Sequence, residues 1–438
     1  MATAVEEGHK VVVLTATQTD AEKLASDLIE ILGEEKVFTF FADDTPLAEF
    51  AFSSQEKVYN RLKSLQFLLS ESAGILLVNL SGSRLLLPNP EYFKKIHVSF
   101  TIGQEFVLEH LVTSLMHMGY DKVSRVTKQG EFSHRGDIID IFDINSQNPI
   151  RVEFFGDELD GIRVFDTVSQ TSIETVSSVV ISPASDILLS EKEFSILEKR
   201  LNEAVSISQN ELQKSYLSEI LFETEKKHLH SDVRKFLSLA YEKEWTILNY
   251  LSRADLLFID DFQRIMEKHA SFELEVADML TIDLQNSKSL PNLVYFANNY
   301  IDYRQHKPST FFSNFHRGLG NLKFDHLYQF NQHSMQEFFS QLPMMIDEIK
   351  RFEKLNYKIV IQVTTENALQ SLQKNLQDYD FDLQSTLEKN IKVVAQVGHF
   401  SQGFQFVDEK FVLITEREIF QKKCDDEFVG KTLVMLKE

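Results

Sequence analysis

Residues 150–155, IRVEFF, combine charged and aromatic side chains in the alternating pattern of a β-strand. Because strand side chains point alternately to opposite faces, Arg151, Glu153 and Phe155 share the face opposite the apolar residues. An aromatic ring beside an arginine on that face has two interpretations. Either a neighbouring strand covers Phe155 within the domain, or the face is a protein-docking surface with an aromatic and an arginine as anchors.

The run LLFIDD ends in Asp260 and Asp261 and has the shape of a Walker-B segment, where the first acid holds Mg²⁺ and the second orients water. The alternative is an ordinary buried strand with solvated acids at its end. A nucleotide site also needs a glycine-rich phosphate loop followed by a helix. The only Gly-Lys-Thr, at 430–432, has Asp425 at the first-glycine position and six residues after it. We interpret that match as chance and predict no working ATPase.

Metal and redox chemistry have little support. His228 and His230 lie on a charged stretch without a third ligand, which indicates a solvated helix face and no metal site. One cysteine, Cys424, excludes an internal disulfide framework and suits a reducing cytoplasm. The chain has no apolar run long enough to span a membrane and no apolar amino-terminal signal, so we expect a cytoplasmic protein without a membrane partner.

The net charge of −21, from 45 basic and 66 acidic residues among 438, argues against sequence-independent DNA binding by this chain. Binding of that kind needs a basic groove that neutralises phosphates, and an acidic chain repels a polyanion. Residues 97–182 hold 6 Lys and Arg against 13 Asp and Glu, a net charge of −7. Their arginines are therefore local contacts on an acidic body, which favours a protein partner over a nucleic acid.

The patterning changes along the chain. Apolar runs at residues 10–17, 37–41 and 74–82 alternate with amphipathic helices, which is typical of an α/β domain with a parallel sheet. Residues 97–182 are rich in short strands and turns, and helical patterning follows Pro183. Strands are predicted again at 254–261, ending in two aspartates, and at 292–297, so we expect the first sheet to resume there after an insertion. A smaller α/β unit follows, with a helix around 335–355 and strands at 358–363, 391–397 and 411–416.

Three segments carry a resemblance to a known family: GEFSHRGDIIDIF at 130–142, PIRVEFFGDELDGIRVFD at 149–166, and SQGFQFVDEKFVLITEREIF at 401–420. Their motifs and order resemble the UvrB-like amino-terminal module of bacterial transcription-repair coupling factors, the Mfd family. The resemblance implies an α/β multidomain fold: a degenerate RecA/helicase-like split domain, an inserted α+β domain and a small carboxy-terminal α/β domain. The implied boundaries are 1–96 (domain 1a), 97–182 (domain 2), 183–325 (domain 1b) and 326–422 (domain 3), with 423–438 unassigned.

The resemblance also implies a function. Domain 2 of that family binds UvrA, and Arg135, Arg151 and Phe155 match its UvrA-binding residues, with Arg163 a weaker candidate. The chain is then expected to recruit UvrA and couple stalled transcription to nucleotide excision repair, with no catalysis and no cofactor of its own. ATP, Mg²⁺, RNA polymerase and double-stranded DNA are expected only for regions of the family beyond residue 438. The alternative is a residual ATP-binding or UvrB-type helicase module, disfavoured because no Walker-A loop is found and the segment after Phe41 is too short for UvrB's damage-probing hairpin.

Overall fold

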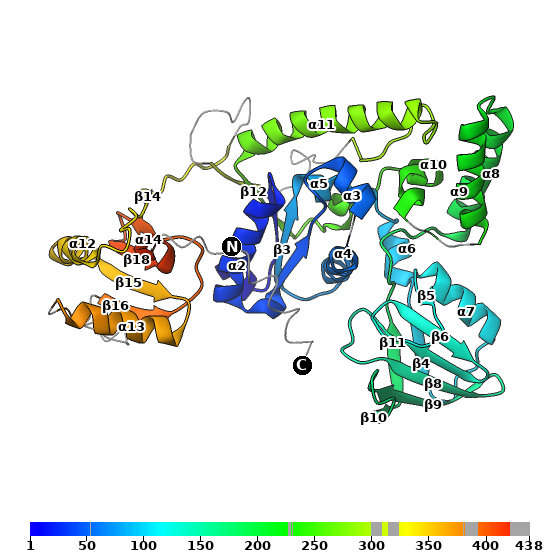
Figure 1. The fold of residues 1–438 in the computed structure, drawn as a ribbon, viewed down its shortest axis with the longest axis horizontal. Coiled ribbons are helices and arrows are strands. Elements are labelled where there is room, and N and C mark those ends of the chain that lie inside the picture. The colour runs from blue at the N-terminus through cyan, green and yellow to red at the C-terminus, as the bar shows by residue number, and fades with distance from the viewer. Residues whose placement is uncertain are drawn as a thin grey trace. The chain divides into compact units, whose positions relative to one another are not determined.

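The computed structural model describes this chain except at residues 53, 227–228, 230, 299–308, 314–323, 380, 382–392 and 421–438 (Figure 1). The pair His228 and His230, Cys424 and the sequence at 430–432 therefore lie outside the described residues. The chain forms two compact units. The first comprises Met1–Ala21 and Lys36–Leu319, and the second comprises Glu22–Glu35 and Gly320–Glu438. No helix among the described residues is long and apolar enough to cross a membrane.

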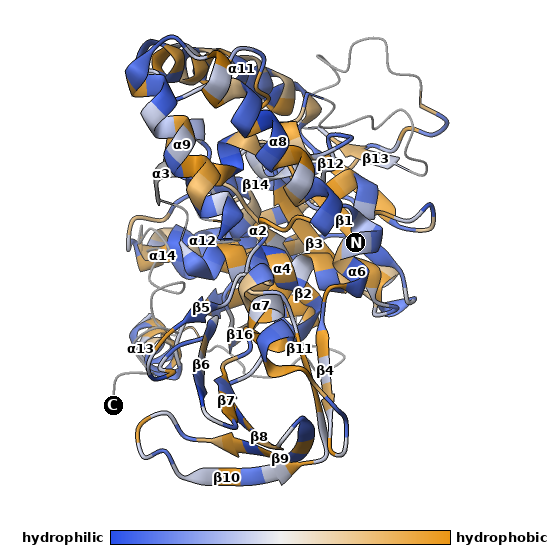
Figure 2. Cartoon of the chain, turned by 90° about the vertical axis from the view of Figure 1, so that its right-hand side faces the viewer, coloured by the Kyte–Doolittle hydropathy of each residue, from blue (hydrophilic) through white to orange (hydrophobic). Residues whose placement is uncertain are grey.

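The first unit contains a parallel five-stranded sheet in the order β13-β12-β1-β3-β2. Its strands are β1 (Lys10–Thr15), β2 (Val37–Phe40), β3 (Gly74–Asn79), β12 (Leu256–Asp260) and β13 (Ser309–Phe312). β1 and β3 are apolar along nearly their whole length because both faces of a central parallel strand are buried. Figure 2 shows this hydrophobic character in β1 and β3, whereas a helix such as α9 carries both kinds of residue.

Helices accompany this sheet within the first unit. Their bounds are α1 (Ala2–Glu6), α3 (Pro46–Phe52), α4 (Gln55–Leu69), α5 (Leu80–Ser83), α6 (Pro90–Lys95), α8 (Glu191–Ile207), α9 (Glu211–Glu225), η2 (Ser231–Phe236), α10 (Leu237–Ala240), η3 (Ile247–Tyr250) and α11 (Phe262–Gln285). Most of α2 (Gln18–Leu32) and of η1 (Glu34–Lys36) belongs to the second unit. A capping box starts α8: the Ser190 side chain accepts from the Glu193 amide, and the Glu193 carboxylate accepts from the Ser190 amide.

The strand predicted at 292–297 is wrong. These residues form turns and irregular backbone, and the outer strand of the sheet is instead β13. Their apolar side chains are buried in ring contacts, since Tyr295 and Phe296 both pack against Phe50 and Phe296 also packs edge-on against Phe272. An apolar run of six residues thus supplied core side chains without strand pairing.

Between β3 and β12 the chain forms a second, six-stranded sheet in the order β10-β9-β8-β7-β6-β5 (Figure 1). Its strands are β5 (Asp121–Lys122), β6 (Glu131–Arg135), β7 (Ile138–Ile141), β8 (Ile150–Phe155), β9 (Glu158–Phe165) and β10 (Ser172–Val176). The pairing is antiparallel except between β5 and β6. A two-stranded sheet of β4 (Val98–Thr101) and β11 (Ser178–Ile181) and the helix α7 (Leu108–His117) accompany it.

A buried ion network connects helices of the first unit with the segment that follows β11. Asp186 is fully buried and lies 2.8 Å from Arg61 Nε, and it also pairs with Arg234. Arg61 in turn donates to Glu49 at 2.9 Å. Two buried arginines thus share one carboxylate. Removing that carboxylate would leave two buried arginines with one carboxylate fewer between them, and Glu49 would still pair with Arg61.

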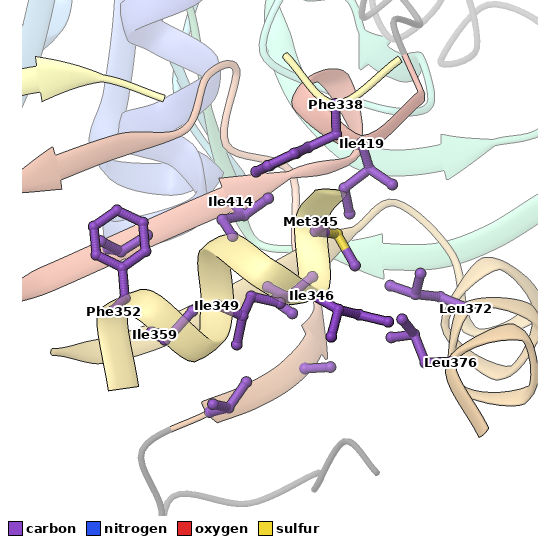
Figure 3. Packing of buried hydrophobic residues seen from close by; sticks show 14 of the residues in the cluster. Phe338, Met345, Ile346, Ile349, Phe352, Ile359, Leu372, Leu376, Ile414 and Ile419 are labelled. Atoms are coloured by element: carbon purple, nitrogen blue, oxygen red, sulfur yellow. The ribbon is translucent and has the colours of Figure 1, made fainter. Parts of the chain in front are cut away.

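The second unit holds a five-stranded sheet in the order β14-β17-β18-β15-β16. Its elements are β14 (Gln332–Ser334), α12 (Leu342–Lys354), β15 (Lys358–Val363), α13 (Glu366–Gln377), β16 (Val393–Val397), β17 (Phe404–Phe406), β18 (Phe411–Thr415) and α14 (Glu416–Phe420). Figure 3 shows the core of Met345, Ile349 and Phe352 of α12 with Ile359 and Ile414 of the strands. The predicted helix start at Met335 is wrong, because Phe339 and Ser340 have positive φ and α12 begins after them. The predicted α/β fold with several sheets is confirmed.

Candidate protein-binding face of the six-stranded sheet

Two tight hairpins shape one end of the six-stranded sheet. Residues 136–137 join β6 to β7, and residues 156–157 join β8 to β9. Gly136 and Gly156 have φ of +58° and +64°, the left-handed conformation that two-residue hairpin turns require and glycine adopts without strain. The two turns lie at the same end because β6 and β8 run in the same direction, and the Phe154 amide donates to the Asp137 carbonyl at 2.8 Å.

The strand register places the predicted contact residues on one face. Directly paired residues project their side chains to the same side of a sheet. One row across β6, β7 and β8 consists of Arg135, Ile138 and Glu153, and the next row across β7, β8 and β9 consists of Asp140, Arg151 and Arg163. Phe155 follows Glu153 by two residues and shares this outer face.

Phe155 is 84% exposed at the end of β8. The interpretation that a neighbouring strand covers its ring is therefore wrong. On the other side of the same strand, Ile150, Val152 and Phe154 are buried, as the alternating pattern predicted. The sheet thus has one core face and one open face, and the large aromatic side chain of β8 on the open face lacks cover.

Arg151 is held rigidly on this face. Its Nε and Nη2 donate to the two carboxylate oxygens of Asp140 at 2.7 and 2.9 Å, and Nη2 also donates to Gln170 at 3.3 Å. The guanidinium lies over the ring of Phe165, 4.6 Å from its centroid, in cation–π geometry. The hydrogen bonds with Asp140 raise the pKa of Arg151 above its usual value. The Arg151 side chain is 26% exposed and that of Asp140 only 4%.

Arg163 lies directly opposite Arg151 across β8 and β9. Like charges in that position destabilise a sheet unless each has its own counter-charge. Arg163 Nη2 bonds Glu153 at 3.0 Å, so the two guanidiniums are neutralised by two different carboxylates. Arg135 is exposed and forms no ion pair with any of the described residues. The four predicted contact residues therefore share a face but differ in how firmly they are held.

Residues 98–186 match the family described as UvrB interaction domain. Over 435 residues the chain is 29% identical to the transcription-repair-coupling factor of Bacillus subtilis (strain 168), covering 96% of the chain, and 28% identical to that of Staphylococcus aureus (strain USA300), covering 95%. The resemblance to transcription-repair-coupling factors is confirmed. The chain spans 37% of the length of each relative.

The segment that matches the UvrB interaction domain runs from β4 through β11 and includes all four predicted contact residues. Two further residues of its open face were not predicted: Ile138, which is 37% exposed, and Asp140. The alternation in RGDIIDIF carries the signal for both. In that stretch Ile139 and Ile141 are buried, so Ile138 and Asp140 must point the other way.

The acidic pair at the end of β12 lies elsewhere in the first unit. Asp261 has a φ of +50° and caps the amino terminus of α11, with its side chain accepting from the Arg264 amide at 3.4 Å. Burial raises the pKa of Asp260, and the charges of Asp20 and Asp261 add to that effect. One acid therefore has a structural role, and the Walker-B interpretation stays a prediction. Among the described residues no group of three or more His, Cys, Asp or Glu is arranged to hold a metal ion.

Proposed function

We propose that this chain binds the repair protein UvrA through the open face of its six-stranded sheet. In this proposal it is the UvrB-like amino-terminal module of a transcription-repair coupling factor and recruits UvrA to nucleotide excision repair at stalled transcription. It performs no catalysis itself. ATP-driven translocation and contacts with RNA polymerase and double-stranded DNA belong to other regions of the full-length relatives.

The exposed ring of Phe155 and the arginines that share its face carry this proposal. Aromatic and arginine side chains dominate the binding energy of protein interfaces when they are buried at the contact. Fully burying a phenylalanine side chain in an interface contributes about 1.5–3 kcal/mol to the binding free energy. An arginine that is already fixed, as Arg151 is by Asp140, loses little conformational entropy on binding.

The surrounding charge is consistent with a protein partner. Asp140 and Glu153 neutralise two of the three arginines on the face, so the face offers hydrogen-bond donors with little net positive charge. A site for a polyanion would instead need several uncompensated cations. The donors of Arg151 that Asp140 leaves free suit carboxylate or carbonyl oxygens on a protein surface.

Isothermal titration calorimetry of the full chain with purified UvrA tests the proposal. The test variant combines Arg135→Ala, Arg151→Glu and Phe155→Ala. A control variant combines Arg253→Glu and Leu212→Ala, which change an exposed arginine and an exposed apolar residue on other elements. We expect the test variant to lose at least about 100-fold in affinity and the control to bind normally. Parental affinity in the test variant would refute the proposed function.

A further inference from the structure

The turn between β9 and β10, residues 166–171 (DTVSQT), presents an exposed apolar side chain. Val168 is 84% exposed, as much as Phe155. The turn follows Phe165, whose ring is covered by the Arg151 guanidinium. An apolar side chain at such a position is common on surfaces, so its neighbours decide whether it has a role.

This turn is fixed by a dense set of hydrogen bonds. Asp166 Oδ1 accepts from the Val168 amide at 3.2 Å and from the amide and hydroxyl of Ser169 at 2.7 and 2.8 Å. These hydrogen bonds lower the pKa of Asp166, and the bond from the Ser169 amide has the largest effect. From a distant loop, Arg125 Nη2 donates to the carbonyls of Thr167 and Val168 at 2.9 and 3.2 Å. Val168 is therefore presented by a rigid support, which reduces the entropy lost when a partner covers it.

Gln170 connects the turn to the open face of the six-stranded sheet, the proposed docking face that carries Arg135, Arg151, Phe155 and Arg163. Its φ is +59°, a left-handed conformation that costs a residue with a side chain of this size about 1 kcal/mol or more. In that conformation its side-chain Nε2 donates to the Thr167 carbonyl at 2.9 Å, and its side-chain Oε1 accepts from Arg151 Nη2 at 3.3 Å. Gln170 thus adopts a strained backbone while contacting an arginine of the docking face.

We propose that the β9–β10 turn is part of the surface that binds UvrA. Val168 contacts the partner directly, and Gln170 is a positioning residue that holds Arg151 in its binding orientation. This inference rests on the proposed function and extends its site to a second apolar contact. Arg151 joins the two parts, because it shares the outer face of β8 with Phe155 and bonds to Gln170 of the turn.

The dimensions of the surface favour this extension. Phe155 pairs with Glu158 at the start of β9, and the β9–β10 turn begins where β9 ends. The eight residues of β9 span about 25 Å. A stable interface buries about 800 Å² on each partner, a patch about 30 Å across. Phe155 lies at one end of such a patch, Arg151 and Arg163 lie farther along β8 and β9, and the turn with Val168 completes its length.

The test measures affinity for UvrA and thermal stability of the full chain carrying Val168→Ala, Gln170→Gly or Phe155→Ala, with Val180→Ala on β11 as the matched control. We expect Val168→Ala to weaken binding about fivefold, since it removes two methyl groups from the contact. Gln170→Gly should weaken binding to a similar extent without lowering the melting temperature, because glycine adopts the left-handed conformation freely. Substituting a residue needed only for folding would lower both the affinity for UvrA and the melting temperature.

A double-mutant cycle identifies the positioning role. With Arg151→Ala already present, Gln170→Gly should have no further effect on affinity, because its action passes through Arg151. If Phe155→Ala weakens binding while Val168→Ala or Gln170→Gly retains parental affinity, the inference about the turn is overturned and the proposed function stands. If Phe155→Ala also retains parental affinity, the proposed function fails.

Discussion

Replacing Asp140 by asparagine should destabilise the six-stranded sheet by about 2 kcal/mol. The Asp140 side chain is 4% exposed, and both its oxygens accept charge-assisted hydrogen bonds from Arg151. Breaking a fully buried ion pair by removing one partner costs about 3–5 kcal/mol. Arg151 is 26% exposed and regains part of its hydration, which reduces the expected loss. Arg163, directly opposite, adds repulsion once the carboxylate is neutral.

Native-state hydrogen exchange of the β7 and β8 amides measures this loss where it occurs. The comparison includes the parent, Asp140→Asn, Arg151→Gln and the double variant, with Asp160→Asn as a control at an exposed acid of the same sheet. We expect a coupling free energy of about 1–2 kcal/mol between Asp140 and Arg151, because each substitution disrupts the same two-bond ion pair. Asp160→Asn should change exchange little.

Additive effects of the two single substitutions would refute this reasoning. They would show that the two hydrogen bonds between Arg151 and Asp140 contribute no net stability. They would also show that Arg151 is not fixed before a partner binds. The entropic advantage assigned to Arg151 in binding would then disappear. Slower exchange in Asp140→Asn than in the parent would be a stronger contradiction, since it would mean that burying this carboxylate costs more than its pairing returns.

Three further substitutions have definite expected outcomes. Phe155→Ala should change the free energy of unfolding by less than about 0.5 kcal/mol, measured by urea denaturation, because the ring is exposed. Ile138→Ser should weaken UvrA binding about fivefold in calorimetry, since Ile138 lies between Arg135 and Glu153 on the docking face. Asp186→Asn should lower the free energy of unfolding by about 3–5 kcal/mol because it removes the buried carboxylate that Arg61 and Arg234 share. Burial opposes the charge of Asp186, but those arginines keep its pKa below 3.8, so its contribution is present above that pH and should be lost as pH falls through the lowered pKa.

Local patterns predicted the strands of the docking face well. The alternation in residues 150–155 identified which side chains of β8 are buried, because a strand with one core face has a fixed period of two. The same reasoning failed at 292–297 and at Met335. Apolar content alone does not distinguish a strand from irregular core backbone. The positive φ of Phe339 and Ser340 interrupts the helical pattern, and Pro343 in the first turn of α12 is the sequence signal for the later helix start.

The partners of each arginine could not be predicted from sequence. Asp140 and Arg151 are eleven residues apart, and their contact follows from the register between β7 and β8, which depends on how the whole sheet assembles. The left-handed conformation of Gln170, on which its proposed role depends, could not be predicted either, since a glutamine gives no sequence signal for it. Local alternation therefore identified the face, and long-range pairing determined how its charges are arranged.

That arrangement explains how an acidic domain can offer arginines to a protein partner. Asp140 and Glu153 neutralise Arg151 and Arg163, so two guanidiniums lie side by side without destabilising the sheet. Arg135, unpaired among the described residues, is the cation that a partner's carboxylate would meet first. Attraction over long distances would then be weak and specificity would depend on close contact, because a face with little net charge steers few partners. An exposed aromatic ring beside fixed hydrogen-bond donors meets that requirement, since its energy is gained only when a complementary surface excludes water.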